Sequence, residues 1–170
     1  GMTFNANDGS VNGTPKASSI SIGGNLTNNG TLTLGSGETI TTGSITNSAN
    51  ITIGSGTLTT YSNFLNAGTL SIDSGTINVS GNLENNSIFT PNSSEIHIAG
   101  NFTNTSSFES TSETLHIAGN FTDTSATSIT YNHIILGGNS TSSITSTNQF
   151  NNLQIIGDGT ITFKNNLTID

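Results

Sequence analysis

The 170-residue sequence contains no cysteine, no arginine and no tryptophan, and only two prolines. Without cysteine, disulfides and thiolate metal sites are excluded. Lys16 and Lys164 are the only cations, and the formal net charge is −8 at pH 7. A nucleic-acid-binding surface must be basic to displace phosphate counterions, and adsorption to an anionic membrane has the same requirement. The sequence therefore excludes a nucleic acid and an anionic lipid surface as partners.

Long apolar segments are also missing. No run approaches the ~18–20 residues of a membrane-spanning helix, and no charged-then-apolar signal peptide is visible, so we expect no membrane insertion. Gly1-Met2 has the form of a tag-cleavage remnant ahead of a start codon. We expect residues 1–17 to be an N-terminal segment, partly tag remnant, and residues 18–170 to be a single domain.

What fills the sequence is Gly, Ser, Thr and Asn, in a repeat of 19 residues. The repeat is clearest around a small residue that recurs at this spacing without insertion or deletion: Gly24, Gly43, Ser62, Gly81, Gly100, Gly119, Gly138 and Gly157. Apolar side chains recur with it, whereas disordered segments scatter theirs. A fixed period of this length predicts a solenoid of stacked repeats.

The apolar residues fall into columns that alternate with polar positions, which is strand periodicity. One column contains Leu26, Ile45, Phe64, Leu83, Phe102 and Phe121, and another contains Leu32, Ile51, Leu70, Phe89 and Phe108. A strict period places Thr39 and Thr41 in the inward columns of the second repeat. The pattern predicts an all-β, right-handed parallel β-helix (β-solenoid) with three short strands per coil and about eight coils. The inward columns move near 138–170, which predicts a change of cross-section there.

Two columns consist of asparagine. One follows the small residue directly (Asn25, Asn63, Asn82, Asn101, Asn120) and one lies three positions further on (Asn28, Asn47, Asn66, Asn85, Asn104). Asn stabilises turns, and stacked Asn amides can bond to each other along a rod. A sugar-binding Asn row is the functional alternative.

The segments Gly24-Asn-Leu-Thr-Asn-Asn-Gly-Thr-Leu-Thr-Leu and Leu115-His-Ile-Ala-Gly-Asn-Phe-Thr resemble the β-helical repeats of filamentous-haemagglutinin-type adhesins and autotransporter passengers. The segments starting at Phe150 and Lys164 are similar to repeats of very large secreted bacterial surface proteins. The resemblance implies a secreted or cell-surface location and a non-enzymatic structural or adhesive role. Expected partners are surface glycans or further copies of the chain stacked end to end.

An enzyme is the first alternative, because polysaccharide-processing enzymes also use parallel β-helices. A lyase needs a cation beside its base, and the two lysines lie near opposite ends of the sequence. A hydrolase needs two carboxylates roughly 5–10 Å apart. Only Glu95 and Glu113, on adjacent coils near one corner, are expected to approach each other. We expect no catalytic residues, no enzyme activity and no cofactor.

The three histidines belong to one outward patch. His97 and His116 share a column on adjacent coils, and Glu95 and His133 share the column two positions before it. Neutral imidazoles and a carboxylate at such spacing can hold Zn²⁺, Cu²⁺ or Ni²⁺. The competing interpretation is that neighbouring coils are near copies, so a ladder repeats whatever one coil carries. The sequence alone favours this second interpretation.

Outward threonine pairs suggest an ice-binding β-solenoid as a further alternative. Thr31/Thr33 and Thr57/Thr59 are the candidate ligand-binding pairs. Ile88, Glu109 and Ala126 interrupt such rows, and under a strict period no Thr-x-Thr array persists on one face. Threonine is also simply a good strand residue for an uncharged surface.

Overall fold

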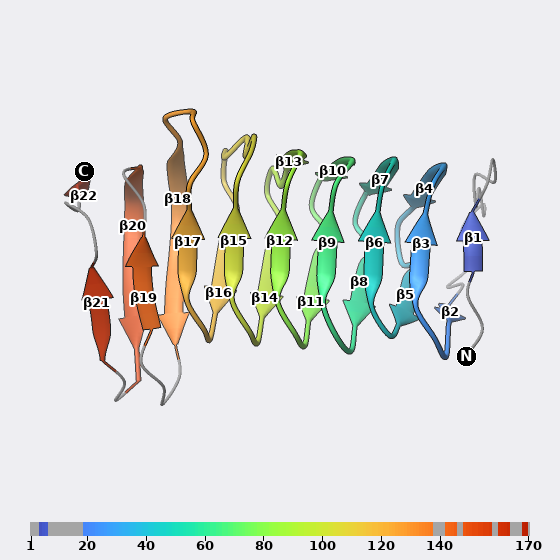
Figure 1. Ribbon diagram of the computed structural model, residues 1–170. Helices are drawn as coiled ribbons and strands as arrows, with labels where there is room; N and C mark the ends of the chain where they lie inside the picture. The colour runs from blue at the N-terminus through green and yellow to red at the C-terminus, as the bar shows by residue number, and fades with distance from the viewer. Residues whose placement is uncertain are drawn as a thin grey trace.

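The computed structural model describes residues 4–6, 19–137, 142–145, 148–157, 160–163 and 168–169. All regular structure in this part of the chain is β-strand, so it contains no helix capable of crossing a membrane. Every strand pair is parallel, and the strands form three sheets that run along a rod (Figure 1). The predicted parallel β-solenoid is confirmed.

Between residues 26 and 98, successive coils contribute one strand to each sheet in turn. Within the described residues, the first sheet consists of β1 (Phe4–Ala6), β3 (Leu26–Asn28), β6 (Ile45–Asn47), β9 (Phe64–Asn66), β12 (Leu83–Asn85), β15 (Phe102–Asn104), β17 (Phe121–Asp123), β19 (Ser142–Thr145) and β21 (Ile161–Phe163). The second consists of β2 (Ser19–Ser21), β5 (Thr39–Thr42), β8 (Thr57–Thr60), β11 (Thr76–Val79), β14 (Glu95–Ile98), β16 (Thr114–Ile117), β18 (Thr130–Gly137), β20 (Gln149–Ile156) and β22 (Thr168–Ile169). The third consists of β4 (Thr31–Leu34), β7 (Asn50–Ile53), β10 (Thr69–Ile72) and β13 (Ile88–Thr90). The first sheet therefore begins within residues 1–17.

The 19-residue register is strict along the middle of the first sheet, from Leu26 through Ile45 to Phe121. It breaks at the next pair, because Phe121 pairs with Ile144, 23 residues later. The prediction of a period without insertion is wrong at this point. Ile144 then pairs with Phe163, so the 19-residue spacing resumes.

A second departure lies in the second sheet. Ile20 pairs with Ile40, 20 residues later, and Ile40 pairs with Leu58, 18 residues later. Ile40 and Thr42 are therefore buried, while Thr39 and Thr41 lie on the outer surface. The prediction that Thr39 and Thr41 point inward is wrong, because a shift of one residue turns every side chain of a strand over.

The corner between β4 and β5 absorbs the extra residue. Here the chain uses residues 35–38, one more than residues 54–56 of the next coil. Gly37 has a φ of 73°, a left-handed conformation that glycine adopts without strain. The buried Glu38 accepts a hydrogen bond from the Gly35 backbone N–H at 2.6 Å and stabilises the wider turn. The register slip is thus accommodated by a specific turn, which has its own left-handed glycine and its own hydrogen bond.

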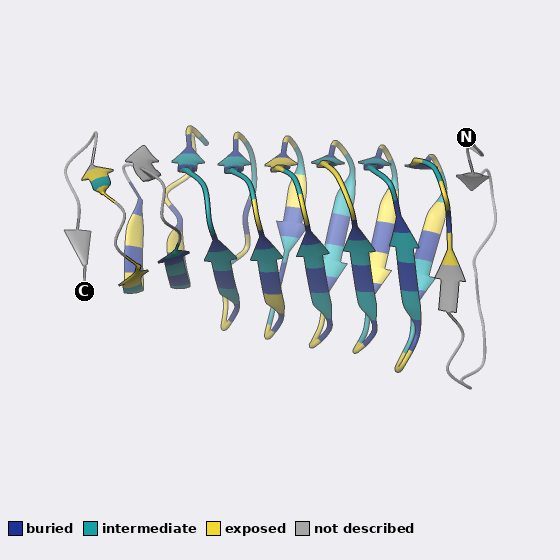
Figure 2. Cartoon of the chain, turned by 90° about the horizontal axis from the view of Figure 1, so that it is seen from below, coloured by how far each residue is buried: buried dark blue, intermediate teal, exposed yellow. Residues whose placement is uncertain are grey.

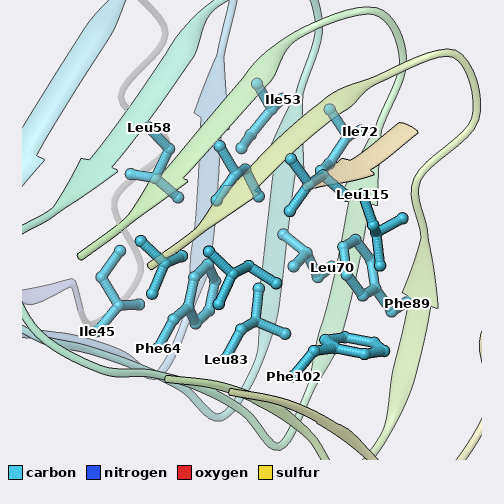
Figure 3. Packing of buried hydrophobic residues seen from close by; sticks show 14 of the residues in the cluster. Ile45, Ile53, Leu58, Phe64, Leu70, Ile72, Leu83, Phe89, Phe102 and Leu115 are labelled. Atoms are coloured by element: carbon cyan, nitrogen blue, oxygen red, sulfur yellow. The ribbon is translucent and has the colours of Figure 1, made fainter. Parts of the chain in front are cut away.

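Inside the rod, apolar side chains form one continuous core. Strands of the first and third sheets alternate buried and more exposed positions (Figure 2), and the buried ones stack on their counterparts one coil away (Figure 3). Toward the C-terminal end the core becomes aromatic. Phe108 packs edge-on against Phe89 and Phe102, with ring centroids 5.1 and 5.9 Å away, and Tyr131 packs against Phe121 at 5.0 Å.

The third sheet ends where these rings begin. Its last described strand is β13, beyond which Phe108 makes only an isolated bridge to Phe89. Three strands per coil therefore holds from β3 to β14, whereas two sheets continue past it in the described chain. At this point the Phe108 ring packs against Tyr131, with ring centroids 4.8 Å apart. The cross-section thus changes before 138–170, a region that is only partly described. Ile155, expected inward, is 48% exposed.

The two Asn columns behave differently. In the buried column, each Nδ2 donates to the Oδ1 of the next Asn at 2.7–2.8 Å, from Asn28 to Asn104. This is the side-chain ladder that stacking predicts. In the outer column the Oδ1 atoms instead accept backbone N–H groups, as Asn82 does from Asn101 at 2.8 Å. A Cβ at Gly100 would lie 2.4 Å from that Asn82 oxygen, so only glycine fits at this corner.

Candidate functional site

The outer face of the second sheet carries the predicted histidine patch. Glu95 and His97 lie on β14, His116 on β16 and His133 on β18. In the register, His97 pairs with His116, and Thr114 lies between Glu95 and His133. Alternation along each strand points all four side chains away from the core. The predicted shared face is therefore confirmed.

Three of the four residues converge. Glu95 Oε1 lies 3.3 Å from His97 Nε2 and 3.2 Å from His116 Nε2. The two imidazole rings stack with centroids 4.5 Å apart and planes 18° from parallel. The carboxylate and the two ring nitrogens lie within 4.8 Å of one another. The Glu95 side chain is 56% exposed and the imidazoles 43% and 33%, so the cluster is open to solvent.

Burial lowers the pKa of His116 below its ordinary value, and the neighbouring His97 acts in the same direction. Glu95 opposes them, by its charge and its hydrogen bond, and raises the same pKa without cancelling the shift. The lowered pKa of His116 favours its neutral imidazole, in which one ring nitrogen can accept a proton or a metal ion.

His133 does not join the three converging residues. It lies diagonally across from His116, and its Nε2 is buried with no hydrogen-bond partner among the described residues. Thr114 lies between His133 and Glu95 in their shared column and keeps the two side chains two strands apart. The converging set is therefore Glu95, His97 and His116.

Beside the histidines lies an open hollow of about 400 Å³. Its lining is mainly apolar: His97, Ile98, Ala99, His116, Ile117, Ala118, Ile135, Gly137 and Ile156. Our sequence reasoning missed this hollow, although a signal is present. The pairs Ile134-Ile135 and Ile155-Ile156 interrupt alternation, so one member of each pair must face outward.

The expected approach of Glu95 and Glu113 does not occur. Glu113 is fully buried and accepts hydrogen bonds from Ser110 Oγ at 2.6 Å and from the backbone N–H groups of Thr111 and Asn132. Glu95 projects from the opposite side of the sheet. The prediction that this pair lies within reach is wrong, because Glu113 organises a corner of the coil.

The threonine candidates occupy two different faces. Thr31 and Thr33 lie on the outer side of the third sheet, opposite Asn50 and Thr52 of the next coil. Thr57 and Thr59 lie on the second sheet, on the same face as the histidines. The register slip adds Thr39 and Thr41 directly beside Thr57 and Thr59. Two complete Thr-x-Thr pairs thus stand next to each other, which a strict period does not predict.

No known protein family, curated protein or solved structure matches this chain. The resemblance to bacterial adhesin repeats thus stays a prediction.

Proposed function

We propose that the chain is a non-enzymatic, rigid spacer or adhesive module of a secreted or cell-surface bacterial protein. The observation that carries this proposal is the buried Asn ladder, which runs from Asn28 to Asn104 in unbroken hydrogen-bonding register. It ties each coil to the next through side chains as well as through the sheets. A surface module benefits from such a ladder, because coils that cannot open separately resist extracellular proteases.

The outer surface is consistent with a spacer. On the second sheet, outward positions between β5 and β11 carry Thr39, Thr41, Thr57, Thr59, Thr76 and Asn78. Charged residues make up only 7% of the chain. A neutral hydroxyl and amide surface offers few strong anchors to unrelated partners.

Antibody labelling of intact cells tests the cell-surface role. Intact cells that produce the native protein are incubated with a fluorescent antibody against the chain, and a cytoplasmic protein serves as the control. We expect the chain to be labelled without cell lysis, while the cytoplasmic control is labelled only after permeabilisation. A chain that is labelled only after permeabilisation contradicts the location.

The adhesive and enzymatic alternatives have their own readouts. A glycan array of the purified chain distinguishes a passive spacer, which binds none strongly, from a carbohydrate-binding module, which selects one glycan class. Turnover of any polysaccharide contradicts the non-enzymatic proposal.

An ice-binding surface is the second candidate, and the register slip is the observation that favours it. Neighbouring strands are about 4.8 Å apart and alternate residues within a strand about 6.7 Å apart. Thr39, Thr41, Thr57 and Thr59 thereby form a regular rectangle of hydroxyl and methyl groups on a rigid sheet. Such a repeat can order water into a lattice.

Thermal hysteresis measures this candidate directly. If ice is the ligand, the parent chain shapes ice crystals and Thr59→Tyr abolishes the effect. The matched control is Thr103→Tyr on the first sheet, away from the threonine rectangle. Unshaped ice crystals with the parent chain eliminate the candidate.

A further inference from the structure

The Glu95–His97–His116 cluster has the dimensions of a metal site. The ligand atoms of a tetrahedral Zn²⁺ with bonds of about 2.0–2.1 Å are about 3.3 Å apart. Glu95 Oε1 lies at 3.3 and 3.2 Å from the two Nε2 atoms. The carboxylate oxygen therefore already stands at the correct separation from both nitrogens.

Duplication of neighbouring coils does not explain the cluster. It accounts for His97 and His116, which repeat in one column, but not for Glu95. The residue that pairs with Glu95 is Thr76 on one side and Thr114 on the other. The carboxylate thus appears on a single coil, two residues before His97 on the same strand and diagonal to His116, and it reaches both histidines.

The backbone holds the two imidazoles on adjacent strands at matching positions. To share an ion, the rings must tilt out of their stacked arrangement so that both Nε2 lone pairs point to it. Their exposed fractions of 43% and 33% leave room for this rotation. The fold therefore already holds the ligand residues near one another before an ion binds, so that less conformational entropy is lost on binding.

The hollow beside the histidines leaves one side of the cluster uncovered. Three protein ligands with an open fourth position, filled by water or by a small ligand, is the arrangement of an accessible zinc site. We propose that Glu95, His97 and His116 bind one Zn²⁺ on the outer face of the second sheet. This site is additional to the spacer role and does not depend on it.

Isothermal titration of the chelator-treated full chain with zinc chloride tests the proposal. We expect one ion per chain, and an affinity that falls about tenfold or more in each of Glu95→Gln, His97→Asn and His116→Asn, since even outer-shell changes cost 10–100-fold. His133→Asn and Glu84→Gln are the matched controls and keep the parental affinity. Glu84 is an exposed carboxylate on the first sheet.

Three outcomes overturn the site: no binding by the parent chain, Glu95→Gln binding as tightly as the parent, or His133→Asn losing as much affinity as His97→Asn. A second measurement guards against variants that misfold. In the parent chain, zinc should shift the imidazole C–H resonances of His97 and His116 together and leave those of His133 in place. Equal shifts of all three histidines indicate adventitious surface binding and reject the site.

Discussion

At the scale of single residues, one buried column of the rod consists of asparagines, from Asn28 to Asn104. Their side chains hydrogen-bond to each other, whereas the other buried columns pack apolar side chains. Each ladder Asn bonds to a neighbouring coil. Asn66 donates to Asn85 Oδ1 at 2.7 Å and to the Ile88 carbonyl at 2.9 Å, and it accepts from Asn47 at 2.8 Å. Buried polar groups are stabilising only while every partner is present. The ladder is therefore sensitive to the loss of one member.

We expect Asn66→Ala to lower the free energy of unfolding by about 2–4 kcal/mol, because the variant leaves the Asn85 oxygen and the Ile88 carbonyl without that donor. Urea denaturation followed by circular dichroism measures the change. Asn78→Ala is the control. Asn78 lies on the outer face with one long contact of 3.4 Å to Thr59, so its loss should cost less than about 0.5 kcal/mol. Equal losses in the two variants contradict a structural role for the ladder.

At the C-terminal end of the described ladder, Asp123 replaces asparagine. Its buried Oδ2 accepts hydrogen bonds from the Tyr131 hydroxyl and from Nδ2 of Asn148 at 2.7 Å and of Asn104 at 3.3 Å. Burial, followed by the charge of Asp123, raises the pKa of Tyr131 well above 10.0. Tyr131 thus closes the ladder as a neutral donor beside a carboxylate.

Removing that donor with Tyr131→Phe should cost about 1–3 kcal/mol at neutral pH. Since the folded-state pKa is raised, the parent chain keeps its full stability below pH 10. It loses stability as the pH rises above 10, where the unfolded tyrosine ionises first. Urea titrations at neutral pH and above pH 10 measure both effects. In Tyr131→Phe this alkaline loss should disappear, while Tyr61→Phe, at a 69% exposed residue, should match the parent.

At the scale of elements, the slip of β5 shows how a repeat accommodates a local preference. Burying Ile40 instead of a threonine contributes a favourable transfer free energy of about 2 kcal/mol. The wider corner at residues 35–38 permits it. The slip also sets the composition of the outer face, because it moves Thr39 and Thr41 to the surface.

The slip predicts opposite costs for adjacent residues. Ile40→Ala should lower the free energy of unfolding by about 2–4 kcal/mol, whereas Thr39→Ala should change it by less than about 0.5 kcal/mol. Chemical denaturation of both variants measures the difference. If Thr39→Ala lowers the free energy of unfolding more than Ile40→Ala does, Thr39 is the buried residue. That result supports a strict 19-residue register and contradicts the slip.

Alternation and period were sufficient to predict β3 to β17 of the first sheet, β4 to β13 of the third sheet and the shared face of the histidines. They failed at β5 because a fixed period was imposed on it. The signal was visible: Gly35-Ser-Gly-Glu-Thr-Ile-Thr-Thr aligns with Gly54-Ser-Gly-Thr-Leu-Thr-Thr once Glu38 is treated as an insertion. The loss of the third sheet after β13 was not predictable from the columns, because Phe108 continues the apolar column of that sheet but makes only an isolated bridge to Phe89.

For the candidate site, the sequence supplied the residues but not their convergence. Column positions placed Glu95, His97, His116 and His133 on one face. Which of them meet depends on side-chain rotamers and on the diagonal offset between strands. The burial of Glu113 illustrates the same limit, since its partners Ser110 and Asn132 come from different coils.

At the scale of the whole molecule, the chain is a rod in which every coil depends on its neighbours. The first and second sheets have nine described strands each (Figure 1). Because neighbouring strands in a sheet are about 4.8 Å apart, each of these sheets spans roughly 38 Å along the axis. A single coil cannot bury its own apolar face, so stability is a property of the stack. In the first sheet, six successive strands keep a strict 19-residue register, from Leu26 to Phe121.

Native-state hydrogen exchange tests most directly whether this stack is one rigid unit. We expect the strand amides from β6 to β15 to exchange with a single common free energy of opening, equal to that of global unfolding. Asn66→Ala should lower this value uniformly across these strands. A gradient of protection, with coils opening one after another and Asn66→Ala affecting only its own coil, would contradict the rigid rod on which the proposed function depends.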